Sequence, residues 1–186
     1  MIGFAMCGSY CTHKYAIDQL KMLISNGYDV LPIMSENVYN TDTRFGKASE
    51  LIEVVSSLCG RSVIHTVVGA EPIGPSMTLD AMIICPCTGN TLAKMSCGIT
   101  DTAVTMAAKA HLRGNRPLIV ALASNDALSA NLKNIGHMLS RKFVYFVPLY
   151  QDDPQKKPHS LIADFSLLKP TLEEAMKGKQ YQKIFI

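Results

Sequence analysis

The sequence of 186 residues contains no run of apolar residues long enough to cross a lipid bilayer. Its first residues turn polar almost at once and lack the basic region that opens a secretory signal peptide. Positive charge is not concentrated either, because the net charge is +3 and the lysines near the C-terminus are spread out. These absences argue against membrane, secreted and nucleic-acid-binding proteins, and we expect a cytoplasmic protein.

The six cysteines show neither the spacing of a metal site nor that of a disulfide framework. Zinc ligands usually come in two pairs, each with its members two to four residues apart. Only Cys7 and Cys11 approach that spacing, and no second pair follows. Cys85 and Cys87 alternate along an apolar run, so their side chains start on opposite faces of a strand. We predict no metal site and interpret most cysteines as small buried apolar residues.

Several common sequence motifs are also absent. The GxGxxG loop of dinucleotide-binding proteins and the Gly-Lys-Ser/Thr ending of a Walker loop do not occur. None of the five histidines sits in a Ser-His-Asp or Cys-His pattern. No internal repeat or low-complexity segment is present. The sequence therefore identifies no catalytic residue. Any phosphate site must differ from the dinucleotide-binding and Walker loops.

What the sequence does contain is an alternation of short apolar runs and helical patterns. Strands are predicted at 1–6, 29–34, 79–85, 117–123 and 143–149, with a weaker one at 61–67. Helices are predicted at 13–27, 44–60, 103–114 and 126–141. This order predicts an α/β fold, a three-layer αβα sandwich with a mostly parallel, Rossmann-like or flavodoxin-like sheet. We predict a single domain over residues 1–186, with a tail of loop and short helix from about residue 150.

In such sheets ligands bind beyond the carboxyl ends of the strands. The loops to examine are therefore 7–13, 35–42, 86–91 and 123–126. The first places Gly8, Ser9, Cys11 and Thr12 between a strand and a helix. Exposed backbone N–H groups and the helix dipole favour a phosphate there. A plain helix cap by Ser9 or Thr12 is the alternative interpretation.

The loop 86–91 holds a second set of polar groups. We expect the strand to end at Pro86, and Gly89 permits a positive φ. Thr88, Asn90 and Thr91 supply hydrogen-bond donors and acceptors at the edge of the sheet. The alternative is that Asn90 or Thr91 merely caps the helix that follows.

The loop 123–126 completes this candidate site. A planar ligand that lies across the edge of the sheet would suit the small residues Ala123 and Ser124. Asn125, after the same strand, would then face that ligand. Candidate partners for anionic groups near the cleft are His13, Lys14 and Lys94, together with the helix N-termini that follow residues 12 and 90.

At these loops the chain resembles the flavoprotein family that includes the homo-oligomeric flavin-containing cysteine decarboxylases. Pro86–Thr91 is similar to the family's Pro-Ala-Ser-Ala-Asn-Thr loop, and Leu122–Asn125 to its Pro-x-Met-Asn motif. The resemblance implies that FMN is bound, with its phosphate or ribityl chain near the first two loops and its ring or the substrate near the others. The implied cofactor-binding residues are Gly8, Ser9, Cys11, Thr12, Ser35, Pro86, Cys87, Thr88, Gly89, Asn90, Thr91, Ala123, Ser124 and Asn125.

Two departures from the family pattern concern the reaction. Decarboxylases of this family use a histidine at the position that Pro72 occupies here. The proline and methionine of the third motif are replaced by Leu122 and Ser124. Decarboxylation of a peptidyl cysteine is therefore not expected.

The whole chain, and most specifically the tail 147–164, is similar to one family member that forms part of a two-subunit oxidoreductase. The resemblance implies oxidation of a small dicarboxylate, dihydrodipicolinate, to pyridine-2,6-dicarboxylate. It implies a partner subunit that carries NAD(P), a homo-oligomer (trimer or higher) within the hetero-oligomer, and the mother-cell cytoplasm of a sporulating bacterium. Two alternatives remain: a flavin-dependent decarboxylase or prenyl-transfer relative, and a non-catalytic protein that stabilises its partner.

Overall fold

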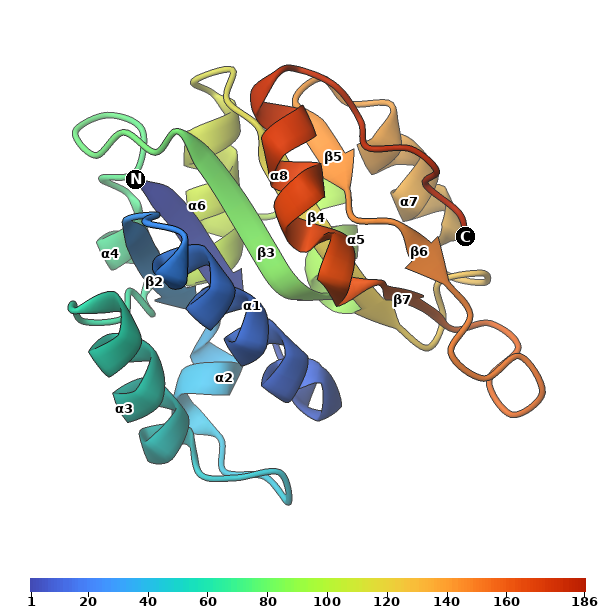
Figure 1. Cartoon of the computed structure of the whole chain (residues 1–186), viewed down its shortest axis with the longest axis horizontal. Coiled ribbons are helices and arrows are strands. Elements are labelled where there is room, and N and C mark those ends of the chain that lie inside the picture. The colour runs from blue at the N-terminus through green and yellow to red at the C-terminus, as the bar shows by residue number, and fades with distance from the viewer.

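The computed structural model describes residues 1–186 and has one seven-stranded, mostly parallel sheet between two layers of helices (Figure 1). The strands are β1 (Ile2–Met6), β2 (Val30–Met34), β3 (Ala81–Thr88), β4 (Leu118–Ser124), β5 (Val144–Phe146), β6 (Leu149–Tyr150) and β7 (Leu161–Ala163). Their order is β2-β1-β3-β4-β7-β6, and β5 also pairs with β4. The predicted αβα sandwich is confirmed, and the order of the first five strands is the flavodoxin-like one.

Helices cover both faces of the sheet. They are α1 (His13–Ser25), α2 (Glu36–Asn40), α3 (Ala48–Cys59), α4 (Val67–Ala70), α5 (Gly89–Ser96), α6 (Ala103–Leu112), α7 (Leu132–Leu139) and α8 (Leu168–Met176), with 3₁₀ turns η1 (Tyr10–Thr12) and η2 (Phe165–Leu167). Helices α1 and α8 lie on one face, and α5, α6 and α7 lie on the other (Figure 1). No helix has the length and hydropathy that a membrane crossing requires.

Three boundaries differ from the sequence prediction. Strand β3 runs past Pro86 to Thr88, because a shift in register between Ile84 and Cys87 accommodates a residue that has no N–H to donate. Helix α7 begins at Leu132 rather than at 126, since a turn around Asp126 comes first. The segment 61–67 forms no strand of the sheet and makes only a single bridge, between Ile33 and Ile64.

The tail after residue 148 is part of the sheet, which the prediction of loop and short helix missed. Strand β7 pairs antiparallel with the end of β4, and β6 pairs with β7. Helix α8 then buries Leu168, Leu172 and Ala175. Strands of two and three residues are too short to show an alternating pattern, so periodicity could not reveal them.

The core positions the carboxyl edge of the sheet. Residues Ala81–Cys87 of β3 are buried without exception, as expected for a strand covered on both faces. After β1 the chain turns toward β2, and after β3 it crosses toward β4 on the other side. The loops after β1 and β3 therefore diverge, and the edge between them is where such sheets bind ligands.

Candidate functional site

A polar hollow of about 450 Å³ lies beyond the carboxyl ends of β1, β2 and β3. It is lined by Gly8, Tyr10, Ser35, Glu36, Asn37, Thr88, Asn90, Thr91, Lys94, Asp101 and Thr102. Tyr10 is the one hydrophobic member of this set. The volume lies in the usual range of small-molecule sites, and the lining offers hydrogen bonds rather than apolar surface.

The loop after β1 presents backbone N–H groups to this edge. The amides of Gly8, Tyr10 and Cys11 donate no hydrogen bond within the chain. The Thr12 hydroxyl donates to the carbonyl oxygen of Ser9 at 2.8 Å, so it is already occupied. N–H groups at the start of a helical segment, free of internal acceptors, suit an anion such as phosphate.

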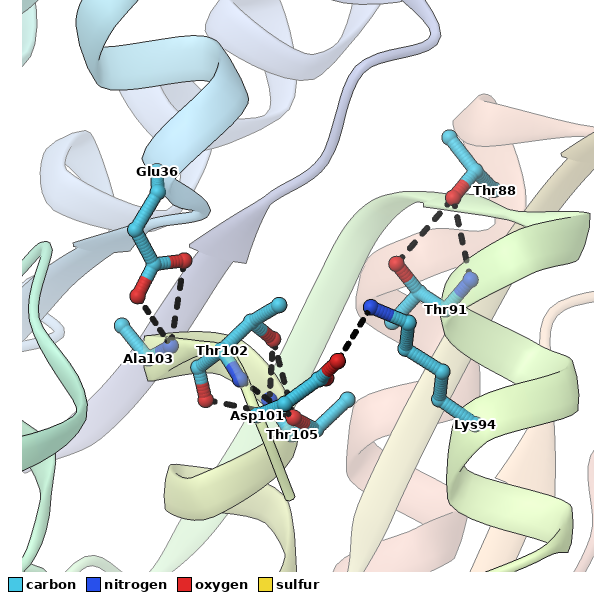
Figure 2. Close-up of polar contacts among 8 residues, drawn as sticks. All are labelled: Glu36, Thr88, Thr91, Lys94, Asp101, Thr102, Ala103 and Thr105. Atoms are coloured by element: carbon cyan, nitrogen blue, oxygen red, sulfur yellow. Dashed lines mark hydrogen bonds and ion pairs between the residues drawn. The ribbon is translucent and has the colours of Figure 1, made fainter. Parts of the chain in front are cut away.

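Thr88 shapes the second wall, as the cap of α5. Its Oγ1 accepts a hydrogen bond from the Thr91 amide at 3.2 Å and donates to Thr91 Oγ1 at 3.1 Å (Figure 2). The predicted alternative caps, Asn90 and Thr91, do not fill this role. The first N–H groups of a helix have no acceptor inside it, and Asn90, in the first turn of α5, lines the hollow. The start of α5 therefore adds polar groups to the edge.

Cys7 lies beneath this wall and is not poised to react. It is buried, and Thr91 Oγ1 donates to its sulfur at 3.3 Å. Burial raises the pKa of the Cys7 thiol to about 11, and the hydrogen bond from Thr91 only partly opposes that effect. Burial also raises the pKa values of Cys85 and Cys87. These residues are neutral thiols of the core, because nucleophiles and metal ligands need the thiolate.

Glu36 closes the third wall by joining α2 to α6. Its two carboxylate oxygens accept hydrogen bonds from the Ala103 amide at 3.0 and 3.4 Å (Figure 2). The same helix end is closed by a capping box, in which Thr102 and Thr105 each accept from the other's amide at 3.1 Å. A carboxylate at a helix N-terminus also interacts favourably with the helix dipole. This end of α6 is therefore already occupied by a protein anion.

Lys94 is the one cationic side chain that lines the hollow. Its Nζ donates to Asp101 Oδ2 at 2.9 Å, across the turn between α5 and α6 (Figure 2). The hydrogen bond from Lys94 is the main cause that lowers the pKa of Asp101 below its ordinary value. Of the three side chains predicted as partners for anionic groups, only Lys94 lies here. His13 bonds the Cys7 carbonyl oxygen, and Lys14 lines a groove beside α3.

Ser35 caps α2 at the bottom of the hollow. Its Oγ accepts a hydrogen bond from the Val38 amide at 3.4 Å. The residues that follow it directly, Glu36 and Asn37, line the hollow too. The loop after β2 is thus a short helix, where the sequence analysis expected only a loop.

The structure brings part of the predicted site together and leaves part of it outside. Gly8, Ser35, Thr88, Asn90 and Thr91 line the hollow. The residues outside its lining are Ser9, Cys11, Thr12, Pro86, Cys87, Gly89, Ala123, Ser124 and Asn125. Pro86 and Cys87 are buried within β3, so their side chains are shielded from a ligand.

Ser124 belongs instead to a neighbouring hydrogen-bond network, and Gly89 packs against that network. Ser124 Oγ donates to Asp126 Oδ1 at 2.5 Å, and Asn131 Nδ2 donates to both oxygens of Asp126 at 3.0 Å. The hydrogen bond from Ser124 is the main cause that lowers the pKa of Asp126, and Asn131 adds to it. A Cβ on Gly89 would lie 2.4 Å from Ser124 Oγ. Glycine is needed here because α5 begins against this network.

The residues of the lining that the predicted cofactor set lacked are Tyr10, Glu36, Asn37, Lys94, Asp101 and Thr102. The Thr-x-x-Thr spacing of Thr102 and Thr105 is a helix-start signal that the sequence contains. The link between Glu36 and Ala103 joins positions 67 residues apart and has no local signal. No group of three or more histidine, cysteine or acidic side chains is arranged to hold a metal ion.

Comparison with known proteins gives one consistent result. The family model described as Flavoprotein matches residues 1–164. The B subunit of dipicolinate synthase from Bacillus subtilis (strain 168) is 42% identical over 185 residues, which cover 100% of this chain and 92% of the relative. The crystal structure of the corresponding dipicolinate synthase B subunit from Bacillus halodurans C is 40% identical with a TM-score of 0.91, over 100% of this chain and 95% of that one.

A more distant structure shares the fold alone. It is the crystal structure of AnUbiX (PadA1) in complex with FMN and dimethylallyl pyrophosphate, at 24% identity and a TM-score of 0.61. It covers 79% of this chain and 76% of that one. Taken with the match over residues 1–164 and the full-length relatives, the fold and the sequence lead to one assignment. The chain belongs to the flavoprotein family and is a homologue of the B subunit of dipicolinate synthase.

Proposed function

We propose that this chain is the B subunit of dipicolinate synthase. It acts with an NAD(P)-binding A subunit and oxidises dihydrodipicolinate to dipicolinate during sporulation, in the cytoplasm of the mother cell. The observation that carries this proposal is the 42% identity to a dipicolinate synthase B subunit over the whole of this chain. The term subunit in the name of that relative implies a partner chain. The chain functions as one domain, because its last strands complete the sheet.

The residues of the polar hollow fit FMN. The free amides of Gly8 and Tyr10, which line the hollow, would hold the phosphate. Hydroxyl groups such as those of Ser35 and Thr102 would contact the ribityl chain. When bound, FMN supplies a redox-active ring that accepts two electrons. Tyr10 gives that ring one aromatic surface to lie against.

The remaining donors of the hollow fit the two carboxylates of the substrate. Lys94 offers a charged donor, and Asn90 at the start of α5 offers neutral ones. Asp101 holds the Lys94 ammonium at 2.9 Å, and so limits the positions it can take. Oxidation of the dihydropyridine ring removes one hydride and one proton and leaves an aromatic pyridine. This chain binds and orients the dicarboxylate while NAD(P)⁺ on the partner subunit takes up the hydride.

The hollow also favours assembly with further chains. Ten of its eleven lining residues are not hydrophobic, so this chain alone covers little of a flavin ring. Ile99, in the turn between α5 and α6, is 46% exposed and offers an apolar contact near Lys94. We therefore include a homo-oligomer, a trimer or larger, within the complex with the A subunit. The apolar cover of the ring would come from a neighbouring chain.

The decisive experiment compares the A subunit alone with the co-purified pair. Dipicolinate formed from dihydrodipicolinate and NAD(P)⁺ is quantified by chromatography. We expect the pair to be faster, and equal rates would remove the catalytic role of this chain. Separately, titration of the purified chain with FMN, followed by flavin fluorescence, should show saturable binding. The absence of binding would remove the flavin from the proposal but not the partnership.

A site variant separates a catalytic subunit from one that only stabilises its partner. Lys94→Ala removes the cation of the hollow. It should slow dipicolinate formation by the two-subunit complex without dissociating the complex. The matched control is Lys169→Ala, because Lys169 is also ion-paired, with Glu173 at 3.3 Å, but lies on α8. If both variants leave the rate of the pair unchanged, the hollow takes no part in the reaction.

A further inference from the structure

A groove of about 580 Å³ lies between α1, α3 and residues 41–47, which lead into α3. Eight of its 17 lining residues are hydrophobic, and five others carry charged side chains. It shares only Tyr10 with the polar hollow described above. The proposed function gives this groove no role.

The floor of the groove is apolar. Val38 and Ala48 are its most buried residues, and Ile17 and Leu51 are half-buried, so part of their surface is open to the groove. Phe45 adds an aromatic ring to the lining and is 55% exposed. An apolar floor beside an open ring suits a flat organic group rather than a simple ion.

The turn that carries Phe45 is held by its own hydrogen bonds. Thr43 and Gly46 exchange backbone hydrogen bonds at 3.0 and 3.1 Å. The Phe45 amide donates to Thr43 Oγ1 at 3.1 Å. The Arg44 guanidinium lies over the Phe45 ring, 4.9 Å from its centroid. The exposure of Phe45 therefore belongs to an ordered turn.

Three lysines surround the groove without ion-pair partners. Lys14 and Lys21 lie on α1, and Lys47 immediately precedes α3. None of the ion pairs of the chain includes them. The start of α3 is already occupied, because the Ala48 amide donates to Asp42 Oδ1 at 2.8 Å. Attraction for an anion therefore comes from the lysine side chains and not from the helix end.

Two carboxylates, those of Asp18 and Glu50, line the same groove and also form no ion pair. A bare anion would use the lysines but neither the carboxylates nor the apolar floor. An apolar ligand would leave all five charged groups without a partner. The lining is complementary to one molecule that combines a flat ring, hydroxyl groups and an anionic group.

We propose that this groove binds a nucleoside 5′-monophosphate. Its base packs on the apolar floor and the Phe45 ring. Its phosphate pairs with the lysines of the rim, and its ribose hydroxyls donate to Asp18 or Glu50. The groove lies apart from the polar hollow, so its occupancy is independent of flavin binding and of dipicolinate formation.

The first test is calorimetric titration of the full chain with adenosine 5′-monophosphate (AMP). We expect saturable binding at one site per chain. Adenosine, which lacks the phosphate, and ribose 5-phosphate, which lacks the base, should each bind at least fivefold more weakly. Absence of saturable AMP binding overturns the proposal. So does equally tight binding of either fragment, because the lysines or the apolar floor would then take no part.

Lysine variants test whether AMP lies in the groove. Lys47→Ala should weaken AMP binding about fivefold, since it removes a positive charge of the rim. The matched control Lys133→Ala removes another exposed lysine without an ion pair, on α7, and should leave AMP binding unchanged. Equal binding by these two variants contradicts the proposal. Lys94→Ala should also leave AMP binding unchanged, and a loss as large as that of Lys47→Ala would place AMP in the polar hollow instead.

A further pair of variants tests the ring. Phe45→Ala should weaken AMP binding severalfold, and Phe45→Leu, which keeps an apolar side chain, should weaken it less. Both should melt close to the native temperature, because Phe45 is exposed and the turn is held by Thr43 and Gly46. If Phe45→Ala binds AMP as tightly as the native chain, the base does not lie in this groove and the proposal is wrong.

Discussion

The two hollows that adjoin α1 and its preceding loop are opposite in chemistry. The polar hollow offers hydrogen-bond donors, since Lys94 and the starts of two helical segments face the same edge. A second hollow, of about 500 Å³ between α1 and the last strands, is acidic, with Asp18 and Asp164 beside the rings of Tyr15 and Tyr150. The first owes its character to backbone placement at strand ends, which any sheet of this topology offers. The second owes its character to side chains alone.

The largest effect should come from Gly89→Ala, which tests whether backbone placement sets the polar hollow. The new Cβ would lie 2.4 Å from Ser124 Oγ and 2.6 Å from Asn131 Nδ2, so α5 must shift. We expect the free energy of unfolding to fall by about 2–3 kcal/mol, as overpacking does. Urea denaturation measures it.

The matched control for Gly89→Ala is Gly136→Ala. Gly136 lies in α7, and a Cβ there meets nothing within 4 Å. This variant should gain up to about 1 kcal/mol from helix propensity. If Gly89→Ala were as stable as Gly136→Ala, the tight start of α5 would not shape the hollow.

The next effect in size is that of Glu36→Ala, which removes the link between α2 and α6. The Ala103 amide loses both carboxylate contacts, so we expect a loss of about 1 kcal/mol in unfolding free energy. FMN affinity should fall as well, because Glu36 lines the polar hollow. Thermal melting and an FMN titration measure these two effects. An FMN affinity equal to that of the native chain would mean that the link between α2 and α6 does not shape the hollow.

Lys94→Met should alter ligand binding more than stability. We expect the affinity of the purified chain for dipicolinate to fall about tenfold, or about 1.4 kcal/mol. The pKa of Asp101 should rise toward its ordinary value, because the hydrogen bond from Lys94 that lowers it is lost. NMR titration of the carboxyl group follows that change. An unchanged dipicolinate affinity would place the substrate outside the polar hollow.

The smallest effect concerns the loss of stability at acid pH. The Asp126 pKa is lower in the folded chain than its ordinary value, chiefly through Ser124. A depressed carboxyl pKa stabilises the folded state above the unfolded pKa, and that contribution is lost as pH falls through the folded pKa. Asp126→Asn should therefore flatten the fall in melting temperature below about pH 4. If the melting temperatures of the native chain and of Asp126→Asn fall equally at acid pH, the Asp126 network has no such role.

The sequence was sufficient for features that depend on local pattern. The long apolar strands and the amphipathic helices predicted the fold, and the loops after β1 and β3 predicted the place of the polar hollow. It was insufficient where contacts join distant segments. The cap that Glu36 provides for Ala103 and the contacts of Gly89 with Ser124 and Asn131 depend on how helices cross. Pro86 and Cys87 entered the predicted cofactor-binding set through the family's loop motif. The sequence placed the end of this strand at Pro86, whereas β3 continues to Thr88.

The pairing of strand β4 also matters while the chain is being synthesised. Along one side it pairs with β5 at Leu118–Val120 and with β7 at Ala123 and Ser124. A nascent chain that does not yet include residues 161–163 leaves the end of β4 with unpaired backbone groups. Open strand edges are templates for aggregation. Strand β7 therefore covers this edge of β4 only after residues 161–163 have been synthesised.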